Sequence, residues 1–178
     1  MEGKLREPLR ELAECSLPAA LEAMGERWSF LILRAAFNGL FHFEEFQSEL
    51  GIARNILANR LARLVEHGIL KREAMADDRR KIEYRLTEKG AALLPTMVAL
   101  RQWGERWETG VAATPVLVDE RDRRPIQQVE VHGWDGRVLH KGDLIWALPE
   151  DIAPADKGEA LGRFSALPTV QARPAPPR

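Results

Sequence analysis

Cysteine is almost absent from this chain of 178 residues, in which Cys15 is the single thiol. One thiol cannot form a disulfide within the chain, which excludes the small secreted domains that disulfides hold together. Long apolar runs are also missing, because no stretch reaches the roughly 18 apolar residues that a helix needs to span a bilayer. The N-terminal residues MEGKLREPLRELAE are charged and lack the apolar segment of a signal peptide. We therefore expect a cytoplasmic protein that has no membrane partner.

The sequence also lacks the residue clusters that mark enzymes and metal sites. Its four histidines, at positions 42, 67, 132 and 140, are scattered without the short spacings of metal ligands. No glycine-rich phosphate loop is present, and no nucleophile is matched with a base. We therefore predict no catalytic residue, no metal and no cofactor.

Net charge is close to zero but unevenly distributed. The formal net charge is −1, yet residues 51–90 hold ten Lys/Arg against six Asp/Glu, whereas residues 1–50 hold five against nine. A polyanion responds to the local charge of a surface rather than to the total. Residues 51–90 are therefore the expected binding segment for a polyanion.

The spacing of apolar residues predicts a mainly α chain with one β-hairpin. The first expected helix follows Ser16 and runs to about Met24, and the others are 27–37, 43–50, 54–66 and 88–109. Ser16 is the expected cap of the first helix, and Pro95 must kink the last helix or mark its restart. Apolar and polar residues alternate around 82–86, which predicts a hairpin over 70–87 with a charged tip.

These elements divide the chain into four parts. Residues 15–111 are the expected winged helix-turn-helix domain, with the helix-turn-helix at 43–67, the wing at 70–87 and a dimer helix at 88–109. Residues 1–14 form an N-terminal arm, and 112–152 a small β-rich appendage. Residues 153–178, rich in Pro and Ala, form a tail that we expect to be disordered.

The helix at 54–66 has one apolar stripe and an opposite face of amides, small residues and arginine. Leu57, Leu61 and Leu64 form the stripe, which predicts burial on the parent domain. The candidates for base contacts on the other face are Asn55, Asn59 and Arg63. Asn can bond both N6 and N7 of adenine, and Arg can bond O6 and N7 of guanine. Ala58 and Ala62 are small enough to let this face approach the bases in a major groove.

Further basic residues lie beside this face and at the hairpin tip. The candidates for phosphate or minor-groove contacts are Arg54, Arg60, Arg79, Arg80 and Lys81. Contacts of this kind give affinity and salt dependence rather than a choice of sequence. Asp77 and Asp78 partly offset the charge of the tip, so the helix is the stronger candidate.

Four segments occur in an order and spacing typical of one family. They are CSLPAALEAMGERWSFLILR, FHFEEFQSELGIARNILANRLARLVEHGILKRE, IEYRLTEKGAALLP and ALRQWGERW. From Cys15 to about Glu108 the chain resembles the HxlR family of bacterial winged-helix transcription regulators, relatives of MarR. The resemblance implies a homodimer whose two recognition helices meet successive major grooves of a pseudo-palindromic site near a promoter. Ala53 departs from the Ser-type helix cap frequent in the family, which weakens the helix start by roughly 1 kcal/mol.

The last helix is too apolar for the edge of a lone domain. Its candidate dimer-interface residues are Leu94, Met97, Leu100, Trp103 and Trp107. Pairing with the first helix of a second copy would bury them. The alternative is that the appendage covers this helix within one chain.

Cys15 stands just before the first helix, at the position of the N-terminal cysteine of the family. The resemblance implies a sensor of oxidants or electrophiles, since that residue has this role in some members. A helix N-terminus can lower the pKa of a thiol and so raise its reactivity, although Glu11 and Glu14 oppose this. The alternative is an inert, partly buried cysteine.

Trp28, at the start of the second helix, also has two interpretations: it belongs to the core, or it lines a ligand pocket.

The hypothesis from sequence is a homodimeric regulator that binds specific double-stranded DNA, with repression favoured over activation and a small-molecule effector as an additional partner. One rival is a winged helix used only for protein–protein contact. Another is an enzyme built on the appendage, which holds no catalytic constellation.

Overall fold

The computed structural model describes residues 15–75, 78, 80–112 and 114–147. The chain divides into one unit over Leu9–Glu130 and another made of Met1–Pro8 and Val131–Arg178. The predicted arm at 1–14 and the predicted tail at 153–178 lie outside the described residues. The wing and all the long helices belong to the first unit.

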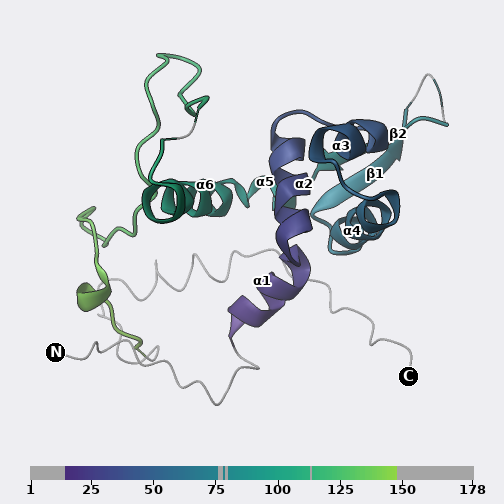
Figure 1. Ribbon diagram of the computed structural model, residues 1–178. Helices are drawn as coiled ribbons and strands as arrows, with labels where there is room; N and C mark the ends of the chain where they lie inside the picture. The colour runs from purple at the N-terminus through teal and green to yellow at the C-terminus, as the bar shows by residue number, and fades with distance from the viewer. Residues whose placement is uncertain (1–14, 76–77, 79, 113, 148–178) are drawn as a thin grey trace. The chain divides into compact units, whose positions relative to one another are not determined.

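Four helices and a hairpin follow one another in the predicted order (Figure 1). They are α1 (Ser16–Met24), α2 (Arg27–Phe37), α3 (Phe43–Leu50), α4 (Arg54–Glu66), β1 (Leu70–Ala74) and β2 (Ile82–Leu86). Ser16 is not the cap of α1 as predicted, because the helix already includes it and Cys15 takes the extended N-cap position. The positive φ of Gly51, 59°, ends α3 and begins the turn into α4.

The predicted helix at 88–109 is interrupted. It consists of α5 (Glu88–Ala91), α6 (Leu94–Gly104) and a π-helical turn, η1 (Glu105–Thr109). Pro95 lies in the first turn of α6, where its missing N–H removes no helical hydrogen bond. Pro95 therefore marks a restart, which is one of the two outcomes expected from the sequence.

The core lies where α2 meets α3, α4 and the hairpin. Ile32 and Leu33 of α2, Phe46 of α3 and the α4 stripe predicted to be buried are enclosed almost completely. Each buried side chain of this size contributes about 2 kcal/mol. Trp28 packs against the same cluster, as its core interpretation required. The core therefore holds α4 by its leucine stripe and leaves the opposite face outside.

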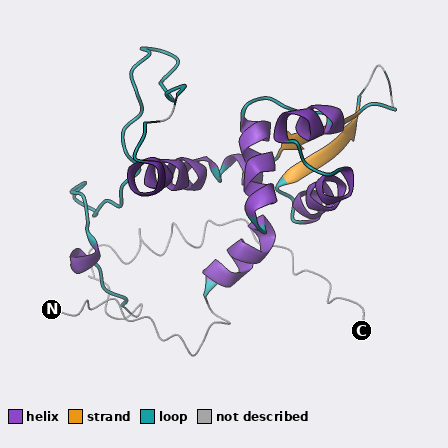
Figure 2. Ribbon diagram, viewed as in Figure 1, coloured by secondary structure: helices purple, strands orange, loops and turns teal. Residues whose placement is uncertain are grey.

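The hairpin is attached directly to the start of α3 (Figure 2). Its strands pair antiparallel, from Leu70 opposite Leu86 to Ala74 opposite Ile82. The N–H of Tyr84 donates to the carbonyl oxygen of Phe41 at 2.8 Å, and His42 forms an isolated bridge with Glu83. The wing therefore keeps a defined position relative to the helix-turn-helix.

The β character predicted for 112–152 is reduced to two isolated antiparallel bridges within its described part. They join Val118 to Pro125 and His132 to Val138, and no strand of several residues is formed there. The apolar residues of this segment, including Val116, Val131 and Trp134, are largely exposed. Without a buried face to stabilise a ladder, the turns persist but a sheet does not. Among the described residues no helix is both long and apolar enough to cross a membrane.

Candidate nucleic-acid interface

The outer face of α4 is exposed because the helix packs on the core through its opposite, leucine-bearing face. Leu57, Leu61 and Leu64 are 0 to 1% exposed, which fixes the rotation of the helix about its axis. Asn55 and Asn59 lie on the opposite side and are exposed, together with the small Ala58 and Ala62. Ala53 caps the helix without a side-chain hydrogen bond, as its apolar side chain requires. The amide face predicted from the sequence is therefore exposed, and Oδ1 of Asn59 accepts from Nη1 of Arg60 at 3.3 Å.

Arg63, the third base-contact candidate, is turned away from that open face. Its Nη2 donates to the carbonyl oxygen of Glu22 in α1, at 2.8 Å, and the residue is half-buried. On a helix, position 63 lies at the border between the exposed arc and the leucine stripe, so its side chain can turn either way. The hydrogen bond to the Glu22 carbonyl oxygen, near the end of α1, holds it in the inward direction.

Arg60 is also engaged within the chain, which argues against its assignment as a phosphate contact. Its Nε lies 2.7 Å from Oε1 of Glu26, the residue that precedes α2. Only 26% of the Arg60 side chain is exposed. The partners of Arg60 and Arg63 lie 34 and 41 residues earlier in the chain, too far away for any local pattern to reveal them.

Three of the remaining basic candidates line one groove between the helix-turn-helix and the wing. The groove has a volume of about 480 Å³, and its basic side chains are Arg54, Arg80 and Lys81. The guanidinium of Arg54 stacks over the ring of Phe43, with its Cζ 4.8 Å from the ring centre. Stacking keeps a cation in place without neutralising its charge, so Arg54 can still meet an anion.

The tip of the wing is partly neutralised, as expected from its aspartates. Oδ1 of Asp78 accepts from Nε of Arg80 at 3.2 Å and from the Arg80 N–H at 3.0 Å. These two hydrogen bonds, the side-chain one first, lower the pKa of Asp78 below its usual value. Arg79 lies outside the described residues.

Glu45 is a supporting residue that the sequence reasoning missed. Its Oε2 accepts the N–H groups of Phe41 and His42, both at 2.9 Å, at the start of α3. These bonds, that to His42 first, lower the pKa of Glu45. The signal was a Glu three residues after the N-cap, but the N-cap is His42 rather than the usual Ser or Thr.

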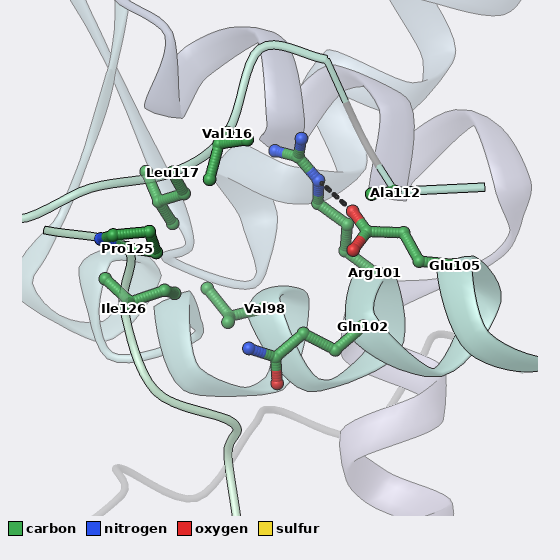
Figure 3. A pocket seen from close by; sticks show the side chains of 9 residues that line it. All are labelled: Val98, Arg101, Gln102, Glu105, Ala112, Val116, Leu117, Pro125 and Ile126. Carbon is green, nitrogen blue, oxygen red and sulfur yellow. Dashed lines mark hydrogen bonds and ion pairs between the residues drawn. The ribbon is translucent and has the colours of Figure 1, made fainter.

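Helix α6, the main part of the predicted dimer helix, is covered on one side by residues 114–130, which we call the strap (Figure 3). Nε2 of Gln102 donates to the Gln127 carbonyl at 3.0 Å, and Oε1 of Gln102 accepts the Val129 N–H at 2.8 Å. Arg101 pairs with Glu105 at 3.0 Å and donates to the carbonyl of Pro115 at 2.8 Å. Between α6 and the strap lies a pocket of about 120 Å³. The predicted covering of this helix within one chain is therefore partly present.

The other side of the dimer helix remains apolar and exposed. Leu100 is 51% exposed, Trp103 52% and Trp107 64%, and Leu94 is also exposed. Met97 departs from this group, because it is half-buried and packs against the core. The exposed apolar face of the helix is thus narrower than predicted, yet four large apolar side chains remain exposed on it.

Cys15 is partly exposed at the N-cap of α1 and is a free thiol. No group of three or more His, Cys, Asp or Glu that could hold a metal occurs within the part of the chain that the structure describes.

Comparisons with known proteins place this chain among helix-turn-helix regulators. The sequence pattern of the HxlR-like helix-turn-helix family matches residues 23–111. An uncharacterized HTH-type transcriptional regulator of Mycobacterium tuberculosis, Rv3095, is 46% identical over 92 residues, which are 52% of this chain and 58% of the relative. The match thus spans less than two thirds of that relative's length.

Two solved structures, both described as candidate transcription factors, share more of the chain. PA1607 is 40% identical with a TM-score of 0.71, and the match covers 78% of this chain and 97% of that one. PA1374 of Pseudomonas aeruginosa is 33% identical with a TM-score of 0.54, covering 81% and 99%. The predicted winged helix-turn-helix fold is therefore confirmed.

Proposed function

This chain belongs to the HxlR-like helix-turn-helix family of transcriptional regulators rather than to a family of enzymes, and on that premise we propose that it binds a specific double-stranded DNA operator as a homodimer. Repression is the favoured outcome, because a dimer bound near a promoter blocks access to it. The protein is proposed to act in the cytoplasm.

One observation carries the proposal: the exposed amide face of α4 and the basic groove lie side by side on one domain. Arg54 stands at the first turn of α4 and lines the groove, so the two surfaces are continuous. An α-helix fits the major groove, where Asn55 and Asn59 can each bond an adenine edge. Phosphates on either side of that groove would meet Arg54 and the basic pair Arg80 and Lys81.

The exposed face of α6 supports the homodimer. Leu100, Trp103 and Trp107 would stay in water in a single chain, and so would Leu17 and Leu21 of α1. In a two-fold dimer, the apolar face of α6 in one copy would pack against the apolar face of α1 in the other, so that a single interface buries both faces. Two copies then present two α4 helices, which fits half-sites about one helical turn, or roughly 34 Å, apart.

Two places are proposed for the input of a signal. The first is the pocket between α6 and the strap, which borders the dimer helix and could take a small effector. The second is Cys15, at the N-cap of α1. If Cys15 is the sensor, a Cys15→Ser variant will keep its DNA bound when an oxidant or electrophile is added, whereas the wild type releases it. Equal release by both proteins would exclude Cys15.

Fluorescence anisotropy on the DNA upstream of the protein's own gene tests the function. We expect binding that survives excess competitor DNA and weakens steeply with salt. Binding that competitor abolishes would call for a selection from random duplexes to find the operator. Absence of binding to any duplex at low salt would overturn the proposal and favour the winged helix that contacts only proteins.

A further inference from the structure

Two arginines of α4 reach back to the corner where α1 turns into α2. We propose that Arg60 and Arg63 are positioning residues, which hold the recognition helix at the rotation that DNA reading requires and do not contact DNA themselves. The proposal rests on the proposed function, since α4 must be the helix that reads DNA.

Arg63 completes the end of α1. The last turn of α1 contains no basic residue of its own. Arg63 supplies both a donor and a positive charge there, through the 2.8 Å bond from its Nη2 to the Glu22 carbonyl oxygen. A cation at a helix C-terminus is favoured by the helix dipole. Arg63 thus ties α4 to the backbone of α1 rather than to a side chain that could swing away.

Arg60 makes the second tether, on the far side of the corner. Its ion pair with Glu26 joins α4 to the residue that precedes α2, while the Arg63 bond joins α4 to α1. Between the two partners stands Gly25, with a φ of 77° that favours glycine. A Cβ at that position would also lie 2.8 Å from Oγ of the buried Ser29, so the corner is tightly built. The two tethers therefore attach α4 to a stiff part of the domain.

The two tethers limit rotation of α4 about its own axis. Positions 60 and 63 lie one turn apart on the same flank of the helix, while Asn55 and Asn59 lie on the neighbouring outer arc. A side-chain tip about 6 Å from the axis moves by about 1.5 Å when the helix turns by roughly 15°. Hydrogen bonds to base edges tolerate only a few tenths of an ångström. Removal of a tether should therefore reduce sequence discrimination before it reduces attraction to phosphates.

A charge swap separates positioning from direct contact for Arg60. In the double variant Glu26→Arg, Arg60→Glu the net charge is unchanged and the ion pair can re-form with opposite polarity. We expect Arg60→Glu alone to weaken specific binding at least tenfold, and the double variant to recover most of it with a wild-type salt slope. If Arg60 touched phosphate, the double variant would stay weak and its salt slope would be smaller by about 0.9. That result would overturn the assignment of Arg60.

For Arg63 the site preference is the decisive readout, measured on a set of operators with single base-pair changes. We expect Arg63→Ala to flatten discrimination at all base pairs read by α4 and to leave non-specific affinity unchanged. Arg63→Lys keeps the positive charge and a hydrogen-bond donor, so it should retain much of the discrimination that Arg63→Ala loses. A change of preference at one base pair alone would make Arg63 a base contact and overturn the assignment. Circular dichroism and urea unfolding would verify that each variant is folded.

DNA binding by the wild-type protein separates a failure of the proposed function from a failure of the positioning role. If it binds no duplex, the proposed function falls and this inference with it. If it binds specifically while the swap fails to recover binding and Arg63→Ala affects one base pair, only the positioning role is wrong.

Discussion

Gly90 of α5 packs against Ile69, just before the wing, and Leu86, at the end of the wing, and its replacement by alanine gives a sharp test of the fold. Gly90 is buried in α5, and a Cβ added there would run into the Ile69 carbonyl oxygen and lie 3.1 Å from Cδ2 of Leu86. The same carbonyl accepts the Thr87 N–H at 3.1 Å and the Thr87 hydroxyl at 3.2 Å. A Cβ at position 90 therefore displaces an acceptor that anchors Thr87, the cap of α5.

The expected cost follows from these contacts. Overpacking by one methyl group costs about 1–3 kcal/mol, and each weakened hydrogen bond adds about 1 kcal/mol. Alanine regains at most about 1 kcal/mol of helix propensity over glycine. We therefore expect Gly90→Ala to lower the free energy of unfolding by about 3 kcal/mol. At about 4–8 °C per kcal/mol, the Tm should fall by about 12–24 °C.

Urea unfolding at one fixed protein concentration is the assay, because association would otherwise add to the apparent stability. Gly142→Ala is the control, since Gly142 is exposed in the short turn Lys141–Asp143, outside the proposed dimer interface, with nothing within 4 Å of an added Cβ. The control should be neutral or more stable than wild type. A Gly90→Ala protein as stable as wild type would refute the packing described for this junction.

Three further predictions concern DNA, assembly and pH. Replacing Arg54, Arg80 and Lys81 together by alanine should reduce the slope of log K against log salt by about 0.9 for each phosphate that these side chains neutralise, and an unchanged slope would remove the basic groove from the interface. Trp103→Asp should convert the dimer to a monomer in sedimentation velocity, and a dimer that persists would place the subunit interface elsewhere. Glu45→Gln should destabilise the protein near neutral pH, and this difference should vanish on acidification: the lowered pKa of Glu45 means that its contribution is present above the ordinary pKa and is lost as pH falls through the lowered one. The urea midpoints of the wild type and of Glu45→Gln, measured across the acidic range, give this difference in stability. A difference that does not change with pH would contradict this role of the carboxylate.

Much of the helix-turn-helix could be read directly from the chain. Apolar spacing located α2, α3 and α4, and alternation located the hairpin, because these periods are properties of local backbone geometry. Gly25, Gly51 and the His67–Gly68 pair gave the ends of the helices for the same reason. The Glu45 cap was also local, but it was missed because its partner at the N-cap is an unusual residue.

The covering of the dimer helix depended on contacts that no local pattern records. The strap reaches α6 through the side-chain amide of Gln102 and the main chain of Gln127 and Val129, so its own sequence carries no sign of the contact. Met97 looked like part of the exposed stripe, yet the direction of α6 turns it toward the core. Apolar residues on a helix can face the core or a partner, and the spacing is the same in both cases.

The sequence by itself determined that α4 has a leucine stripe and an opposite amide face, since both follow from 3.6 residues per turn. Only the tertiary structure decided the directions of the arginine side chains on its flanks. Arg54 stacks on Phe43 beside the groove, whereas Arg60 and Arg63 turn toward Glu26 and Glu22. A long side chain at the border of a helix face can serve either side. Its direction depends on which acceptors lie within reach, and for Arg60 and Arg63 folding brings those acceptors from 34 and 41 residues away.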